Sequence, residues 1–279
     1  MIDRIGFMQG RLSPLADGRI QAFPWSCWQD EFAVAEQHQF QLMEWTLDQE
    51  RLYDNPLLTP AGQAEITHFR QKHSIEIASL TGDCFMQSPF WKTRGFECTE
   101  LQNDFRAVAR ACSAVGISMM VLPLVDNGRL ASRAEEDVLV DVLQGEAKLL
   151  EELSVKVVFE SDFAPVELAR FIDRLDPTLF GVNYDIGNSA SLGMNPADEM
   201  IAYGHRIVNV HIKDRILGGA TVPLGTGSAD FEAVFAGLAR IAYAGNYILQ
   251  TARAADGDHA AALCRYRDMA IGWIKQYGA

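Results

Sequence analysis

Cysteine is scarce, and its spacing follows no recognisable pattern. The chain has 279 residues and five cysteines, an odd number, with no CxxC pair among them. Disulfide frameworks and zinc ribbons need paired or closely spaced thiols. We therefore expect reduced thiols in a cytoplasmic protein.

Long hydrophobic runs are also missing. The most apolar strand-like run, 119–125, has seven residues, whereas a membrane-spanning helix needs about 20. The first residues, MIDRIGFMQG, lack the apolar stretch of a secretory signal. Both absences predict a protein with no membrane partner.

Basic residues are outnumbered by acidic ones. There are 24 Lys and Arg against 37 Asp and Glu, a formal net charge of −13. Such a surface repels phosphate backbones, so a nucleic-acid partner is not expected. The sequence also has no GxSxG, HExxH or P-loop motif, which disfavours nucleophilic acyl transfer and nucleotide hydrolysis.

What the sequence does contain is a repeated strand and helix pattern. Short runs rich in β-branched or aromatic residues recur about every 35 residues, the pitch of a βα unit. They lie at 5–8, 42–45, 75–80, 118–125, 155–160, 180–185, 207–212 and 247–250. Eight such repeats predict an α/β fold, a single (β/α)8 TIM barrel over residues 1–279, with an open doubly wound sheet as the main alternative.

Helix-start signals lie between these runs. Thr59-Pro60 and Asn195-Pro196 place proline at a first helical position, and Ser132 with Glu135 forms a capping box. Asp230 is expected to cap a helix that continues to Gly245. The aromatic stretch 85–99 is either a lid over the barrel mouth or a packed surface loop.

Polar residues occur at the ends of the last four predicted strands. Glu160, Asp185 and Gln250 end their runs, and His211 lies near the end of another. Barrel chemistry takes place at the carboxyl ends of the strands. Because side chains alternate along a strand, these four residues can form one ring. Two carboxylates, an imidazole and an amide oxygen suit one divalent metal ion, such as Mn²⁺, Mg²⁺ or Co²⁺. The alternative for the histidine alone is a hydrogen-bonded core residue.

The segments VVFES, NYDIGN, VHIKDR and PLGTGSADF, together with the opening MQGRLSP, resemble the sugar phosphate isomerase/epimerase superfamily of xylose-isomerase-like barrels. The resemblance implies a divalent metal held by Glu160, Asp185, His211 and a fourth residue at position 250. It also implies that two glutamates move a proton beside a sugar carbonyl. Relatives often have Glu where this chain has Gln250.

The glutamine at position 250 limits the possible reactions. Its carbonyl oxygen can still bind a metal, but it cannot accept a proton. Aldose–ketose isomerisation needs only one base, and Glu160 can serve. Epimerisation needs a second proton-transfer group, for which Lys213 is the first candidate, ahead of Asp214 and Glu44.

Six further residues are candidates for substrate binding. Arg11, Arg215 and Arg253 can bind an anionic group; Glu44 can bind a substrate hydroxyl or orient a ligand. The alternatives for Arg11 and Glu44 are structural salt bridges. The full set is Arg11, Glu44, Asn188, Asp214, Arg215 and Arg253.

The leading hypothesis is a metal-dependent isomerase or epimerase of a monosaccharide or a derivative, possibly phosphorylated, with Glu160 as the base and Lys213 as a second catalytic residue. The alternatives are a metal-dependent dehydratase of a keto-polyol or cyclitol, a non-catalytic sugar-binding barrel, and abasic-DNA cleavage, which the charge opposes. We expect a small-molecule sugar as the substrate and a homodimer as the assembly.

Overall fold

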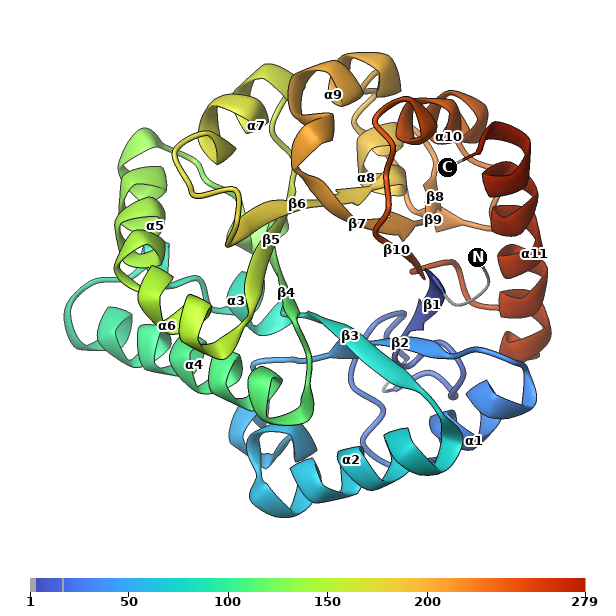
Figure 1. Ribbon diagram of the computed structural model, residues 1–279, viewed down its shortest axis with the longest axis horizontal. Helices are drawn as coiled ribbons and strands as arrows, with labels where there is room; N and C mark the ends of the chain where they lie inside the picture. Colours follow the sequence, from blue (N-terminus) through green and yellow to red (C-terminus); the bar gives the residue numbers. More distant parts are fainter. Residues whose placement is uncertain (1–3, 17, 279) are drawn as a thin grey trace.

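A computed structural model describes residues 4–16 and 18–278. Eight parallel strands close into a barrel in the order β1-β10-β7-β6-β5-β4-β3-β2 (Figure 1). The barrel strands are β1 (Ile5–Met8), β2 (Leu42–Thr46), β3 (Glu76–Thr81), β4 (Met119–Leu124), β5 (Lys156–Ser161), β6 (Phe180–Asp185), β7 (Ile207–Ile212) and β10 (Asn246–Leu249). The predicted TIM barrel is therefore confirmed.

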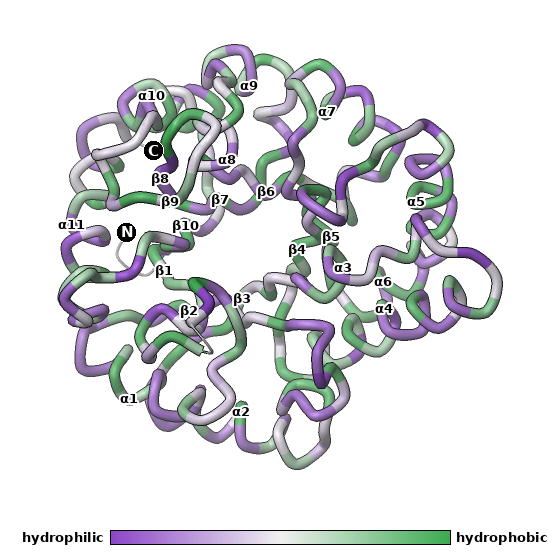
Figure 2. Tube along the Cα trace, turned by 180° about the vertical axis from the view of Figure 1, so that it is seen from behind, coloured by the Kyte–Doolittle hydropathy of each residue, from purple (hydrophilic) through white to green (hydrophobic). Residues whose placement is uncertain are grey.

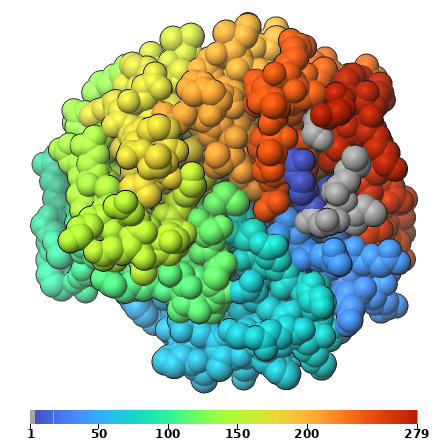
Figure 3. Space-filling view, in the orientation of Figure 1, coloured from blue at the N-terminus to red at the C-terminus, as the bar shows by residue number. Residues whose placement is uncertain are grey.

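Helices surround this barrel. They are α1 (Asp30–Gln37), α2 (Pro60–His73), α3 (Asp83–Gln87), α4 (Gly95–Val115), α5 (Arg133–Gly145), α6 (Ala147–Leu153), α7 (Pro165–Ile172), α8 (Ile186–Ser191), α9 (Pro196–Tyr203), α10 (Phe231–Arg240) and α11 (His259–Tyr277). In the space-filling view the colours run around the molecule in chain order, from blue to red (Figure 3). Pairing of β1 with β10 closes the ring, with Phe7 opposite Leu249.

The eight predicted strands match the observed ones to within about two residues at each end. The sequence pattern did not reveal a small hairpin after β7, in which β8 (Asp214–Arg215) pairs with β9 (Thr221–Val222). Two-residue strands carry too little periodicity to be recognised. This hairpin matters because it lies beside the carboxyl ends of the barrel strands.

The predicted helix starts are confirmed. The Thr59 hydroxyl accepts a hydrogen bond from the Gly62 amide, and the Asp230 carboxylate caps α10 by accepting one from the Ala233 amide. The predicted end of α10 at Gly245 is wrong. The helix ends at Arg240, and Ala242 then adopts a positive φ of 52°, a turn that local propensity does not indicate.

Apolar side chains form two buried groups. The larger fills the space between strands and helices, so hydrophilic and hydrophobic colours alternate along the outer helices (Figure 2). A separate small cluster consists of Met8, Leu42, Ala78 and Ile248. In the stretch 85–99, Phe85, Phe90 and Trp91 are buried, which favours a packed segment. None of the described helices has the length and apolar composition needed to cross a bilayer.

Candidate active site

A cavity of about 480 Å³ opens at the carboxyl ends of the barrel strands. Polar and charged side chains predominate in its lining, so the cavity offers many hydrogen-bond partners to a ligand. The lining consists of Gln21, Thr81, Asp83, Met86, Gln87, Pro123, Val125, Asp126, Glu160, Asp162, Asn188, Ser191, Leu192, Lys213, Arg215 and Gln250.

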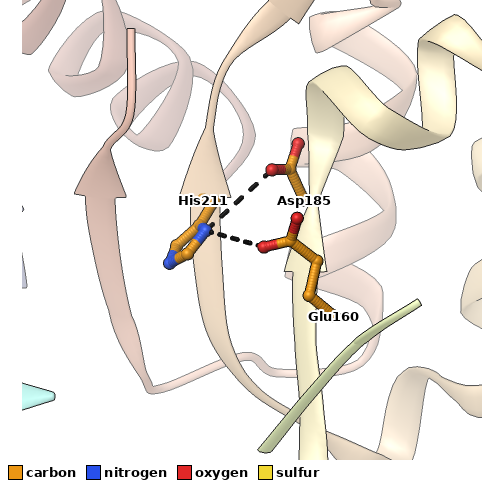
Figure 4. A group of neighbouring side chains, drawn as sticks. All are labelled: Glu160, Asp185 and His211. Atoms are coloured by element: carbon orange, nitrogen blue, oxygen red, sulfur yellow. Dashed lines mark ion pairs between the residues drawn. The ribbon is translucent and has the colours of Figure 1, made fainter. Parts of the chain in front are cut away.

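Three of the predicted metal ligands converge beside this cavity. Glu160 from β5, Asp185 from β6 and His211 from β7 each offer one ligand atom, and these atoms lie within 4.8 Å of one another. The Nδ1 atom of His211 lies 3.3 Å from Glu160 Oε2 and 3.9 Å from Asp185 Oδ2 (Figure 4). All three residues are buried, and two of the three ligand groups are carboxylates.

A carboxylate beneath the cavity holds the far side of the His211 ring. Glu44 Oε1 lies 2.8 Å from His211 Nε2. Glu44 is itself fixed, because its oxygens accept hydrogen bonds from the Ser79 and Thr81 hydroxyls at 2.6 and 2.5 Å and from the Asn209 amide at 3.1 Å. This arrangement directs Nδ1 towards Glu160 and Asp185.

The charges around His211 favour its protonated form. Burial alone would lower the pKa of His211, but the Glu44 and Glu160 carboxylates raise it to about 10. A divalent ion binds only the deprotonated nitrogen. Metal binding at this ring would therefore displace a proton.

Two amide side chains position Glu160. Asn188 donates to Glu160 Oε1 at 2.5 Å, and Asn183 donates to Oε2 at 3.3 Å. Burial alone would raise the pKa of Glu160, but the neighbouring His211 and Lys213 lower it below its usual value. Glu160 is therefore held as an ionised carboxylate at neutral pH.

Both oxygens of the Asp185 carboxylate have a neighbour. Its Oδ1 accepts a hydrogen bond from the Asn188 backbone amide at 2.8 Å. Its buried Oδ2 is paired with the Lys213 ammonium 2.6 Å away and lies 3.9 Å from His211 Nδ1. A metal ion bound to Oδ2 would therefore share this oxygen with Lys213.

Lys213 and Gln250 are in contact at the cavity wall. Lys213 Nζ donates to Gln250 Oε1 at 2.9 Å, and Gln250 Nε2 donates to Gln21 Oε1 at 2.9 Å. The fourth predicted ligand oxygen thus faces the lysine ammonium. A metal ion that used this oxygen would share it with Lys213.

Asn188 and Arg215, two of the six predicted substrate-binding residues, line the cavity. Arg215 Nη1 donates to Asn188 Oδ1 at 2.8 Å, and its Nε and Nη2 donate to the Gly219 carbonyl. The β8–β9 hairpin therefore positions the guanidinium beside the cavity. An oxygen-bearing substrate can contact both side chains there.

Glu44 and Asp214 do not line the cavity, so the structure favours roles other than substrate contact for these two residues. Glu44 contacts His211, which agrees with the orienting alternative. Asp214 is fully buried, and its carboxylate accepts hydrogen bonds from the Gly225, Gly227 and Ala229 amides. It fixes the loop before α10 and has no oxygen facing the substrate space.

Arg11 and Arg253 are also outside the cavity lining. Arg11 donates to the Ile20 carbonyl at 2.7 Å and to Gln21 Oε1 at 3.3 Å. Arg253 Nη1 donates to the Gly10 carbonyl. Both guanidiniums thus hold the connection after β1 through hydrogen bonds to carbonyl and amide oxygens.

Sequence reasoning missed Gln21 as a cavity residue. It lies in the connection between β1 and α1, where no periodic pattern indicates which side chain reaches the barrel mouth. Asp83 and Asp126 follow β3 and β4, and this position at the strand ends predicts substrate contacts from the sequence. The structure places both side chains in the cavity lining.

Comparison with known proteins agrees with this geometry. Residues 32–269 match the family model described as the xylose isomerase-like TIM barrel. The chain belongs to the xylose isomerase-like TIM barrel family.

Curated relatives of this family member include two inosose dehydratases. That of Geobacillus kaustophilus is 32% identical over 42% of this chain and 46% of that protein, so the match spans less than half of the relative. That of Bacillus cereus is 25% identical over 64% of this chain and 72% of the relative. A solved structure, the IOLI protein with a bound zinc atom, superposes with a TM-score of 0.75 at 17% identity, covering 98% of this chain and 99% of the other. The last comparison shows the shared fold.

Proposed function

We propose that this family member is a divalent-metal-dependent enzyme that removes a proton from the carbon beside a carbonyl group of a polyhydroxylated substrate. The observation that carries the proposal is the convergence of Glu160, Asp185 and His211 within 4.8 Å beside a polar cavity. The overall reaction favoured is dehydration of a keto-polyol or cyclitol. The curated inosose dehydratases support this choice over isomerisation.

The donor set fits a divalent metal ion. Two buried carboxylates and an imidazole offer ligand atoms within 4.8 Å of one another, and Asp185 Oδ2 lies 3.9 Å from His211 Nδ1. Glu160, Asp185 and His211 would hold the ion, with Gln250 Oε1 as a fourth candidate. Mn²⁺, Mg²⁺ and Co²⁺ suit oxygen-rich sites, and the zinc atom of the IOLI protein adds Zn²⁺ to the candidates. When bound, such an ion would act as a Lewis acid on a substrate oxygen.

Glu160 is the proposed base. Its pKa is lowered, so it is ionised before the substrate arrives, and Asn188 and Asn183 fix its orientation. It takes the proton from the carbon beside the carbonyl, and the electron pair of that C–H bond moves towards the carbonyl oxygen. The positive charge of Lys213, which lines the cavity, favours this movement of negative charge towards the carbonyl oxygen.

Because Gln250 cannot accept a proton, the site favours reactions in which Glu160 is the only carboxylate base needed. In a dehydration, the C–O bond at the next carbon breaks and the hydroxyl leaves as water, for which it needs one proton. The proton-bearing side chains in the cavity lining, among them Lys213 and Asp83, are the candidate sources of this proton. Isomerisation of an aldose or ketose is the second candidate, because Glu160 could return the same proton to the neighbouring carbon.

The two reactions can be separated in one assay. Purified protein with Mn²⁺ would be incubated in D₂O with a keto-inositol and a panel of ketoses. We expect solvent deuterium beside the carbonyl, loss of water from the keto-inositol and a new enone absorbance in the ultraviolet.

Glu160→Gln is the catalytic control and should abolish deuterium exchange. A protein that binds the metal but exchanges no proton in any substrate would contradict the proposal and favour a sugar-binding barrel. Aldose–ketose conversion without loss of water would favour the isomerase.

A further inference from the structure

A second carboxyl group, that of Asp83, lines the same cavity as Glu160. Asp83 begins α3, directly after β3, and its side chain is only 6% exposed. Glu160, Asp185 and Lys213 lie on or after β5, β6 and β7. The cavity therefore has carboxyl groups from well-separated strands of the barrel.

A continuous chain of hydrogen bonds links Asp83 to Lys213. An ammonium group can only donate, so Lys213 must contact the amide oxygen of Gln250. The Gln250 amide nitrogen then donates to Gln21 Oε1 at 2.9 Å, and Gln21 Nε2 donates to Asp83 Oδ2 at 2.6 Å. This order fixes both amide orientations. The amide nitrogen of Gln250 therefore faces Gln21, and the amide nitrogen of Gln21 donates a hydrogen bond to Asp83.

Asp83 is surrounded by groups that favour a protonated carboxyl. Together these surroundings raise the pKa of Asp83 to about 7: burial has the largest effect and raises it, the Gln21 amide lowers it, the Asp48 and Glu160 carboxylates raise it, and Arg11 lowers it. Of these groups, Asp48 and Glu160 carry negative charge and Arg11 carries positive charge. The neighbouring Cys84 thiol is buried, with its pKa raised well above the usual value. Asp83 can therefore hold and release a proton near neutral pH.

Lys213 is less free to deliver a proton. Its ammonium lies 2.6 Å from Asp185 Oδ2 and 2.9 Å from Gln250 Oε1. Both acceptors hold the protons of the ammonium group, whereas the Asp83 carboxyl lines the cavity with Gln21 as its hydrogen-bond donor. Asp83 is therefore better placed than Lys213 to give a proton to a substrate in the cavity.

We propose that Asp83 is the second acid–base residue of this site and gives its proton to the departing hydroxyl of the substrate. This assignment rests on the proposed function. In the step, the O–H bond of the Asp83 carboxyl breaks, a new O–H bond forms on the leaving hydroxyl, and the substrate C–O bond breaks to release water. The electron pair on the carbonyl oxygen re-forms the C=O bond as the C=C bond of the enone forms and the C–O bond breaks. Solvent then carries the proton that Glu160 took back to Asp83, which returns both carboxyl groups to their starting states. Asp83 thereby takes the proton-transfer role that Gln250 cannot perform.

The test compares Asp83→Asn with wild type in the D₂O assay with keto-inositol and saturating Mn²⁺. Asparagine keeps the shape of the side chain but cannot supply the proton. We expect loss of water to slow by about 10²–10⁴-fold, the usual contribution of acid–base catalysis. Deuterium exchange beside the carbonyl, which needs only Glu160, should continue. Asp54→Asn, the same change at an exposed carboxylate, should leave both rates unchanged.

The pH profile gives a second readout. The wild type needs protonated Asp83, so the ratio of wild-type to Asp83→Asn elimination rates should fall as the pH rises through about 7. Asp83→Glu should restore part of the elimination rate and the pH dependence. Circular dichroism shows whether Asp83→Asn folds. If it does not, the elimination rate of Asp83→Glu and the fall of the wild-type elimination rate above pH 7 provide the test.

Three outcomes would overturn the assignment. The first is unchanged elimination in folded Asp83→Asn, and the second is equal loss of exchange and elimination, which would indicate a structural role. The third is a wild-type elimination rate that does not decline above pH 7. A wild type that shows no exchange at all would instead refute the proposed function, and with it this assignment.

Discussion

At the scale of single residues, His211 is constrained at both ring nitrogens. Glu44 contacts Nε2 at 2.8 Å, and Nδ1 faces Glu160 at 3.3 Å and Asp185 at 3.9 Å. Carboxylates that contact the second nitrogen of a metal-binding histidine fix the ring and increase its basicity. Glu44 is therefore a positioning residue for the proposed metal site.

Glu44→Gln tests this role. The amide would keep most of the volume but lose the negative charge next to His211 Nε2. We expect Mn²⁺ affinity to fall by about 10–100-fold, the typical effect of removing such a partner. Isothermal titration calorimetry at fixed pH measures it.

Glu36→Gln is the matched control, because Glu36 pairs with His73, outside the cavity. Its Mn²⁺ affinity should equal that of wild type. Equal affinities for wild type and folded Glu44→Gln would show that Glu44 does not support a metal-binding histidine.

At the scale of elements, close packing of α8 against the segment after β7 places Lys213. A Cβ atom added to Gly187, near the start of α8, would lie 2.7 Å from Lys213 Cγ and 3.0 Å from its Cβ. No real side chain tolerates such a contact without movement. A glycine at this position therefore keeps Lys213 next to Asp185.

Gly187→Ala should displace Lys213. We expect a loss of about 1–3 kcal/mol in the free energy of unfolding, as in other overpacked sites, and slower turnover. Gly145→Ala is the control, since an added Cβ there meets nothing within 4 Å. Urea denaturation and the dehydration assay measure the two effects; equal behaviour of both variants would argue against this packing constraint.

One carboxylate, that of Asp214, holds three backbone amides of the loop before α10. Asp214 accepts hydrogen bonds from the Gly225, Gly227 and Ala229 amides at 2.8–3.1 Å. A buried amide that loses its acceptor costs about 1–3 kcal/mol. Asp214→Asn should therefore destabilise the loop by about this amount, with faster hydrogen exchange over 225–229. Unchanged protection of these amides would show that the loop is held by other contacts.

At the scale of the whole molecule, metal binding should stabilise the folded barrel. The three proposed ligands come from β5, β6 and β7, which are brought together only by folding. An ion present at 100 times its dissociation constant adds about 2.7 kcal/mol to the free energy of unfolding. We expect Tm to rise by about 5 °C at this concentration of Mn²⁺. Thermal unfolding of wild type and Asp185→Asn measures this; an equal rise in both would indicate binding elsewhere.

The barrel and the convergence of three candidate metal ligands were predictable because each depends on a strong, repeated signal. Glu160, Asp185 and His211 lie at or near the ends of apolar strands, and the ends of parallel strands meet at one rim. The orientations of Asp214 and Arg253 were not predictable, because each side chain follows a turn whose direction depends on tertiary contacts. Gln21 lies in a long connection without periodicity. The homodimer remains a prediction, since the structure describes a single chain.

Anomalous diffraction from crystals grown with Mn²⁺ tests the central claim most directly. We predict one strong peak bonded to Glu160, to Asp185 and to Nδ1 of His211. Crystals that contain Mn²⁺ only at other places, or that show the His211 ring turned away from both carboxylates, would contradict it.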